Sequence, residues 1–289
     1  MLILHDYPES FFAEKVRRIL AWKGVPWRQV EQPKIMPKPD LVALTGGYRR
    51  VPVLQVGAEV YCDTARIARA LDEIVPEPAC IPPQQRALCA LLEDWGDRRL
   101  VPQVVAPVIV SIMPMLPPGF LEDRASMSPG LGERVWRATA PSGRRQAVFS
   151  FDRLDDMLRE RPFLLGDAFT LADAACFHPV WFARQDPALA EAISERRALA
   201  AWFARIEAFG PGQVRAMTPA EALAIAREAA PADGDGPEVA VYADDYGTEA
   251  TRGRLVRRTD DAITLRRTDP IVGDVAVHFP RAGYRIEKV

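Results

Sequence analysis

Short apolar runs separated by turn-forming residues dominate the beginning of the chain. Leu2-Ile3-Leu4 is followed by the turn-like segment His5-Asp6-Tyr7-Pro8, and this pattern predicts a buried strand. From Phe11 to Leu20, apolar side chains recur at helical spacing, and Gly24 then supplies a stop signal, as in an amphipathic helix. The chain is therefore predicted to open as a strand, a turn and a helix.

The same succession of strand and helix patterns continues to about residue 75. The expected elements are a strand at 27–30, a short helix at 40–44, strands at 51–56 and 59–61 joined by a tight turn, and a helix that begins at Asp63-Thr64 and ends at Pro76. This order of elements predicts a small mixed sheet with helices on both faces.

A proline-rich linker at 76–83 leads into a long region with helical patterning, from 84 to 230, in which alanine, leucine and arginine are abundant. Two segments rich in loop-forming residues, 117–132 and 141–143, are predicted to interrupt it. Thr170 and Asp173 have the spacing of a capping box directly before an apolar run, which predicts the start of a buried helix.

Helical periodicity ends at a second linker, 230–238, whose sequence is APADGDGPE. Beyond it, short strand patterns alternate with turn residues, at 239–242, 253–258, 262–267, 274–279 and 284–289. So many short strands in one small segment predict a small β-barrel or an SH3-like sheet. We therefore predict three domains, at 1–78, 84–230 and 238–289.

Composition narrows the class of protein without changing this outline. Hydrophobic residues make up 48% of the 289 residues and charged residues 26%, which is ordinary for a globular protein that buries a large core. The formal net charge of −2 argues against tight, non-specific binding to nucleic acid or to an anionic membrane. We therefore expect neither nucleic acid nor membrane as a partner.

The chain also lacks the signals of export. Its first residues have no basic start and no long apolar run, and the best candidate for a membrane span, 104–115, is cut by Pro107 and Pro114. The four cysteines show no CxxC spacing, which is typical of a reducing compartment. We therefore expect a cytoplasmic protein. Cys176 and His178 lie on one predicted helix without further ligands nearby, so we also expect no metal site.

Several features of the first 75 residues belong together chemically. Ser10 lies where the first strand turns into the first helix, Val51-Pro52 begins a strand with Arg50 just before it, and Asp63-Thr64 begins a helix. A helix N-terminus with a hydroxyl group binds a carboxylate, and Asp63 can pair with an amine. A strand end behind a cis X–Pro bond can pair with an extended peptide.

Glutathione has these groups: an amine and a carboxylate on the γ-glutamyl residue, an extended backbone, a second carboxylate and a thiol. A hydrogen-bond donor near a helix N-terminus lowers the pKa of a thiol, and Ser10 fits that position. The sequence therefore predicts a glutathione site in the first domain.

Three segments resemble the cytosolic glutathione S-transferases over roughly residues 1 to 230, and most closely the tau, zeta and omega-like classes. They are LILHDYPESFFAEKVRRILAWKG, RRVPVLQVGAEVYCDTARIARAL and LLGDAFTLADAA. The resemblance implies an α+β multidomain fold with a thioredoxin-like N-terminal domain and an all-α second domain, to which a small β-barrel-like extension is added. It also implies transfer of glutathione, as co-substrate, to small electrophiles in detoxification, without a metal, by a homodimer.

The resemblance carries roles to individual residues. Ser10 stabilises the thiolate, because Ser10-Phe11-Phe12 is similar to the family's Ser-Pro-Phe motif; Phe12 belongs to the same motif. The remaining glutathione-binding residues that it implies are Lys34, Arg50, Val51, Pro52, Asp63 and Thr64, of which Lys34 and Arg50 are candidates for the glycyl carboxylate.

Departures from the family pattern leave alternatives open. Phe11 replaces the family's proline, Tyr7 is a rival donor to the thiol, and Ser10 is also a favoured residue for capping a helix. The chain is therefore alternatively a non-catalytic, glutathione-binding or transferase-like scaffold whose β module engages a partner. Arginines at 257–258 and 266–267 are expected to be a solvated face, with an anionic partner as the alternative.

Overall fold

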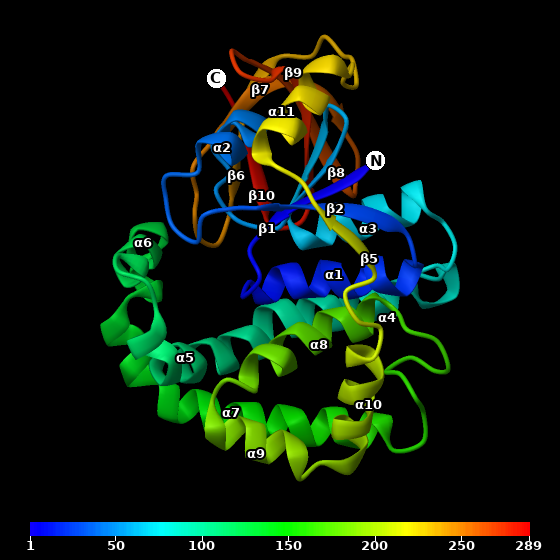
Figure 1. Cartoon of the computed structure of the whole chain (residues 1–289), viewed down its shortest axis with the longest axis vertical. Coiled ribbons are helices and arrows are strands. Elements are labelled where there is room, and N and C mark those ends of the chain that lie inside the picture. Colours follow the sequence, from blue (N-terminus) through cyan, green and yellow to red (C-terminus); the bar gives the residue numbers. More distant parts are fainter. The chain divides into compact units, whose positions relative to one another are not determined.

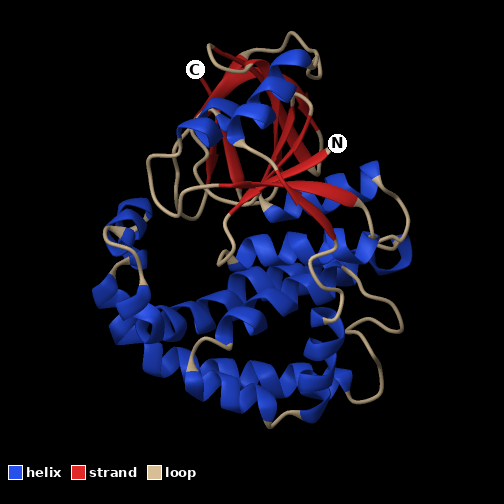
Figure 2. Ribbon diagram, in the orientation of Figure 1, coloured by secondary structure: helices blue, strands red, loops and turns tan.

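The structure is a computed structural model that describes residues 1–289. It divides into two compact units that interleave along the sequence. Unit 1 comprises Met1–Ala13, Val25–Ala70 and Gln213–Val289, and unit 2 comprises Glu14–Gly24 and Leu71–Gly212. All the strands belong to unit 1, whereas the regular elements of unit 2 are helices (Figure 2).

Unit 1 begins with the predicted strand, turn and helix. Its first elements are β1 (Leu2–Asp6), the start of α1 (Phe11–Lys23), β2 (Pro26–Glu31), α2 (Pro39–Thr45), β3 (Val53–Val56), β4 (Glu59–Cys62) and the start of α3 (Thr64–Ile74). In the sheet these strands have the order β2-β1-β3-β4, with β1 and β2 parallel and the other neighbours antiparallel. This confirms the predicted thioredoxin-like arrangement.

The C-terminal strands extend this same sheet. They are β6 (Glu238–Ala243), β7 (Thr251–Arg258), β8 (Ala262–Asp269), β9 (Gly273–Pro280) and β10 (Tyr284–Lys288). Strand β9 pairs in parallel with β4, so the full order is β10-β6-β7-β8-β9-β4-β3-β1-β2-β5 (Figure 1). The five predicted strands are present, but the pairing does not confirm a separate small barrel, because their ladder continues into the N-terminal strands.

Residues 213–228, which we expected to be part of the helical domain, also belong to unit 1. They form β5 (Gln213–Ala216) and α11 (Pro219–Glu228). Strand β5 pairs in parallel with β2, and Met217 N donates to Gln29 O at 2.8 Å. The strand is short and three of its four residues are exposed, so no alternation of apolar residues marks it in the sequence.

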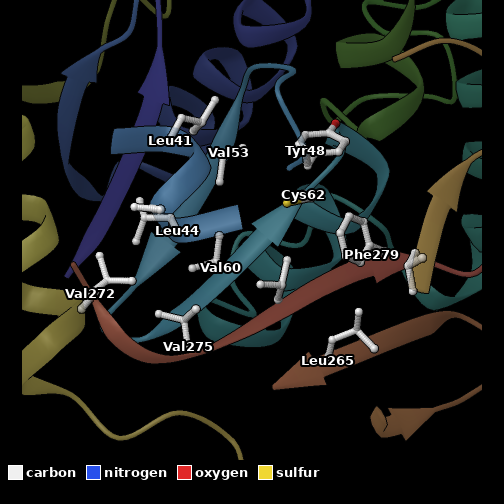
Figure 3. Close-up of a cluster of buried hydrophobic side chains, with 14 of the residues drawn as sticks. Leu41, Leu44, Tyr48, Val53, Val60, Cys62, Leu265, Val272, Val275 and Phe279 are labelled. Carbon is white, nitrogen blue, oxygen red and sulfur yellow. The ribbon is translucent and has the colours of Figure 1, made fainter. Parts of the chain in front are cut away.

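One hydrophobic core joins the N-terminal and C-terminal parts of unit 1 (Figure 3). Leu44 of α2, Val60 of β4 and Leu223 of α11 pack in the same cluster as Leu265 of β8 and Val277 of β9. Each such side chain contributes roughly 1.5–3 kcal/mol when it is fully buried. The C-terminal strands therefore form part of the core of this unit.

Unit 2 is an assembly of helices. It contains α4 (Arg86–Trp95), α5 (Val101–Ile112), α6 (Phe120–Met127), α7 (Glu133–Leu158), α8 (Leu171–Ala183), α9 (Pro187–Ser194) and α10 (Arg197–Glu207), together with a π-helical turn (Gly96–Leu100) and the 3₁₀ turns Pro83–Gln85, Met113–Met115 and Pro129–Leu131. No helix of the structure is both long and apolar enough to span a membrane.

Of the two loops that the sequence predicted in this region, one is partly helical and the other is wholly helical. The segment 117–132 contains α6, and 141–143 lies inside α7. A Cβ at Gly143 would lie 2.7 Å from Gln103 O and within 3.2 Å of Pro107. Gly143 therefore allows α5 and α7 to pack closely and does not form a turn, which is why the Pro141-Ser142-Gly143 pattern misled the prediction.

The predicted capping box at the start of α8 is confirmed. Thr170 is the N-cap, and the reciprocal bonds between Thr170 and Asp173 are both present. Asp173 is fully buried, and its carboxylate also accepts hydrogen bonds from Leu164 N at 2.8 Å and from Trp202 Nε1 at 2.9 Å. Burial raises the pKa of Asp173, while these donors oppose that shift.

Candidate functional site

Three segments that were predicted to bind glutathione lie at one end of the sheet in unit 1. Strand β1 runs antiparallel to β3 with His5 opposite Val53, and β3 runs antiparallel to β4 with Val53 opposite Cys62. At this end the chain therefore leaves β1 for the turn before α1, enters β3 from Pro52, and leaves β4 toward Asp63. Residues that are about 50 positions apart in the sequence are brought together by the strand pairing.

Ser10 is buried at the start of α1. Its backbone N donates to Tyr7 O at 3.0 Å, and its hydroxyl accepts a hydrogen bond from Ala13 N at 3.3 Å. The hydroxyl thus caps α1 at the position that was predicted to face a thiol. Phe12 is half-buried, and its ring lies 4.7 Å from that of Phe11.

The Val51–Pro52 peptide bond is cis, as the sequence predicted. Val51 is half-buried and Pro52 is buried, and β3 begins at the next residue. The segment therefore has the conformation that suits pairing with the backbone of an extended peptide.

Asp63 and Thr64 occupy the N-terminus of α3, also as predicted. Thr64 is the first helical residue and is buried. Asp63 has a φ of 75°, and it is the chain's one residue other than glycine with a positive φ. Its Oδ1 accepts a hydrogen bond from Ala65 N at 2.9 Å, and its Oδ2 accepts one from Tyr284 Oη at 3.0 Å. The carboxylate is therefore held by its own helix and by the last strand of the sheet.

Arg50 is engaged by the C-terminal part of the chain. Its guanidinium group donates to both carboxylate oxygens of Asp245, at 2.6 and 3.2 Å, and to the backbone carbonyl of Tyr246. It also lies 4.1 Å from the ring of Tyr246 and 5.7 Å from that of Tyr48. Binding of a glycyl carboxylate by Arg50 would require the pair with Asp245 to open.

Two lysines lie near the turn between β1 and α1. Lys34 is half-exposed, and its Nζ is 2.6 Å from a carboxylate oxygen of Glu9. Lys38 is buried, donates to Arg49 O at 3.1 Å, and has its Nζ 5.8 Å from the centre of the Tyr7 ring. The ion pair with Glu9 places Lys34 beside the turn that carries Ser10.

The sequence did not reveal Asp245, Tyr246 and Tyr284 as neighbours of the predicted site. Tyr284 contacts Asp63 from 221 positions away, and Asp245 contacts Arg50 from 195 positions away. No local pattern connects residues at such separations; the pairing of β4 with β9 and the shared hydrophobic core join these parts of the chain.

The four cysteines are free and buried. Burial raises the pKa of Cys62 well above its ordinary value, and the neighbouring Asp63 adds to the shift. The pKa values of Cys80 and Cys176 are also raised by burial. Because the thiolate is the reactive form, a raised pKa makes a thiol a weak nucleophile at neutral pH. None of these three cysteines therefore has the properties of a reactive cysteine. The structure contains no cluster of His, Cys, Asp and Glu that could hold a metal ion.

Unit 2 contains a buried charge network that the sequence did not suggest. Lys15 Nζ lies 3.0 Å from Glu93 Oε1 and 2.7 Å from Asp97 Oδ2, and His178 Nε2 lies 2.8 Å from Asp97 Oδ1. Burial alone would lower the pKa of Lys15, but the two carboxylates raise it above its ordinary value. The network satisfies its charges internally, as buried ion pairs in a folded core do.

The arginines of the C-terminal strands differ in exposure. Arg266 pairs with Asp233 and, at 2.7 Å, with Asp274, and Arg267 pairs with Asp269 at 3.0 Å. Arg257 and Arg258 are exposed.

Comparison with known families matches two parts of the chain. Residues 4–79 match the glutathione S-transferase N-terminal domain, and residues 137–205 match the glutathione S-transferase C-terminal domain. No curated protein matches the chain.

Solved structures extend the similarity over the whole chain. A GST-like protein from Pseudomonas syringae is 36% identical, with a TM-score of 0.80, over 100% of this chain and 99% of that protein. A glutathione S-transferase from Rhodospirillum rubrum is 24% identical, with a TM-score of 0.57, over 73% of this chain and 90% of that one. Glutathione transferase F7 from Populus trichocarpa is 15% identical, with a TM-score of 0.56, over 78% of this chain and 99% of that one. The last two matches show the fold alone, and they leave about a quarter of this chain uncovered.

Proposed function

Because the chain belongs to the glutathione S-transferase family, we propose that it binds glutathione at this end of the sheet and transfers it to a small electrophile. The observation that carries the proposal is the convergence of the Ser10 turn, the cis Val51–Pro52 bond and the N-terminus of α3 at one end of three paired strands. Each of the three supplies what one part of glutathione needs.

In this proposal the backbone beside Pro52 pairs with the cysteinyl residue of glutathione. The hydroxyl and the N–H groups at Thr64 bind the γ-glutamyl carboxylate, where the helix dipole favours negative charge. Asp63 pairs with the γ-glutamyl amine. Lys34 binds the glycyl carboxylate, for which it must exchange its pair with Glu9.

Ser10 is the proposed catalytic residue, with Phe12 lining the site beside it. Its hydroxyl donates a hydrogen bond to the glutathione sulfur, which favours the thiolate over the thiol. The thiol proton leaves to solvent, the sulfur forms a bond to the electrophilic carbon, and the leaving group departs with the electron pair of the broken bond. The transfer needs no metal. We further propose a cytoplasmic homodimer that acts in detoxification.

A second candidate function is a non-catalytic, transferase-like scaffold. It is favoured by the contacts of Arg50 with Asp245 and Tyr246, since the loop between β6 and β7 engages a residue of the predicted site. In that case the glutathione site serves binding or regulation, and the β strands engage a partner.

Calorimetric titration with glutathione, followed by a conjugation assay with a panel of electrophiles, separates these functions. We expect binding by the wild-type chain and by Ser10→Ala, with a loss of conjugation rate of about a hundredfold in Ser10→Ala. The pKa of bound glutathione, followed by thiolate absorbance against pH, is expected to rise in the same variant.

Tyr7→Phe is the matched control, because Tyr7 is the other candidate donor and lies in the same turn. Full activity in Ser10→Ala together with its loss in Tyr7→Phe would assign the thiolate to Tyr7. Binding without turnover of any electrophile would establish a glutathione-binding scaffold. No binding at millimolar glutathione would reject the transferase and favour a transferase-like scaffold that does not use glutathione.

A further inference from the structure

One hydroxyl group of the last strand reaches the predicted glutathione site. Tyr284 is the first residue of β10 and is 5% exposed. Its Oη donates to Asp63 Oδ2 at 3.0 Å. The ring packs 5.3 Å from that of Phe279 on β9, in the core that the C-terminal strands share with β3 and β4. The position of this hydroxyl is therefore fixed by the packing of its ring.

The direction of the hydrogen bond follows from the state of the tyrosine. Burial raises the pKa of Tyr284 well above its ordinary value, and the negative charge of Asp63 raises it further. The phenol is therefore protonated at neutral pH, and its proton is donated to the carboxylate.

Asp63 needs such support because of its backbone. A φ of 75° is unfavourable for a residue with a Cβ, at a cost of about 1 kcal/mol. The bond from Ala65 N holds Oδ1, and the bond from Tyr284 holds Oδ2.

We infer that Tyr284 is a positioning residue: it fixes the orientation of the Asp63 carboxylate in which that carboxylate binds the amino group of bound glutathione. This inference rests on the proposed function, in which Asp63 binds that amine. The C-terminal strands, which lie outside both matched family domains, then complete the amine end of the site.

A second contact ties the same C-terminal region to the site. Tyr284 pairs with Ala243 in the β10–β6 ladder, and the chain continues from Ala243 to Asp245 and Tyr246, which engage Arg50. Asp63 is therefore held by the first residue of β10, and Arg50 is held by the loop that follows β6.

The test compares glutathione with its desamino analogue, in which hydrogen replaces the γ-glutamyl amino group, by calorimetry on the full chain. Tyr284→Phe removes the hydroxyl and keeps the ring, so the fold should persist. We expect it to weaken glutathione binding about three- to tenfold, the effect of one lost hydrogen bond, and to leave the affinity for the desamino analogue unchanged.

Two further variants complete the design. Asp63→Asn should weaken glutathione binding, and adding Tyr284→Phe to it should have no further effect, because the tyrosine acts through the carboxylate. Tyr242→Phe, on β6 and stacked with Arg285, is the matched control and should bind both ligands as the wild type does.

The outcomes separate the inference from the proposed function. If the wild-type chain binds glutathione and Tyr284→Phe binds it equally well, or loses both ligands to the same extent, the positioning role is rejected and the proposed function stands. If the wild-type chain does not bind glutathione, both are rejected.

Discussion

Helices α3 and α8 both begin with an aspartate and a threonine, but their carboxylates have different surroundings. At α8, Asp173 is fully buried in unit 2 and accepts hydrogen bonds from Leu164, Thr170 and Trp202. At α3 in unit 1, Asp63 is half-buried, and it accepts one bond from its own helix and one from Tyr284.

The difference separates a folding role from a binding role. The carboxylate of Asp173 accepts hydrogen bonds from several buried donors of the protein itself, so its removal leaves those donors without a partner. Asp63 is only half-buried, and it lies at a sheet end where two other predicted binding segments converge. A helix-start carboxylate in a sequence is therefore ambiguous until its tertiary neighbours are known.

The largest expected effect is the loss of stability in Asp173→Ala. The substitution leaves the backbone N–H groups of Leu164 and Thr170 and the indole N–H of Trp202 unsatisfied inside the core. We expect the free energy of unfolding to fall by about 3 kcal/mol or more, measured by chemical denaturation. Asp63→Ala should lose less than half as much free energy of unfolding. An equal loss in the two variants would show that the two carboxylates do not differ in their contribution to folding.

Acid should reduce the free energy of unfolding mainly because of buried His5 in unit 1, and not because of the carboxylate Asp173 at the start of α8. His5 is fully buried, and burial lowers its pKa from 6.5 to about 4, against the opposing effect of its hydrogen bond with Gln55. Below pH 6.5 the unfolded chain takes up a proton that folded His5 does not accept until about pH 4. Stability should therefore fall by about 3 kcal/mol across this window.

Asp173 acts in the opposite direction, because its raised pKa means that the folded chain binds a proton more readily than the unfolded one. Denaturation of the wild type and of His5→Asn between pH 7 and pH 4 checks the sign. The pH slope should be shallower in His5→Asn, with a remainder from His178, whose pKa burial also lowers. An unchanged slope would show that His5 is not the titrating group.

The smallest effects are expected from the two threonines. Thr170→Val removes the N-cap hydroxyl of α8 and should lower stability by about 1 kcal/mol, with glutathione affinity unchanged. Thr64→Val should weaken glutathione binding a few-fold, because the γ-glutamyl carboxylate loses one donor, and should change stability less. Thermal unfolding and calorimetry on the pair measure both quantities. The distinction fails if both variants lose stability and neither loses affinity.

Local patterns were enough to predict most of the elements. The apolar runs of β1, β3 and β4 alternate with turn residues, and the capping box at Thr170 is a short-range arrangement. Such features depend on neighbours within a few positions, so they are readable in one sequence. The helix start at Asp63 was predicted on the same basis, whereas the cis Val51–Pro52 bond was inferred from what the binding of an extended peptide requires.

Local patterns failed where a distant partner decides the conformation. Gly143 and Pro141 are typical of a turn, yet α7 continues through them because Gly143 lets α5 approach. Strand β5 has no apolar alternation, and it is defined by its parallel pairing with the edge of β2. In both cases the deciding contact lies far away in the sequence.

The sequence by itself determined the thioredoxin-like order of elements, the helical region and the residues that fit the groups of glutathione, because periodicity, capping and turn chemistry act locally. Only the tertiary structure decided that the C-terminal strands extend the same sheet and that Tyr284 and Asp245 contact Asp63 and Arg50. The physical reason is that strand pairing depends on backbone hydrogen bonds and a shared core, which can join segments about 200 residues apart without leaving a pattern in either.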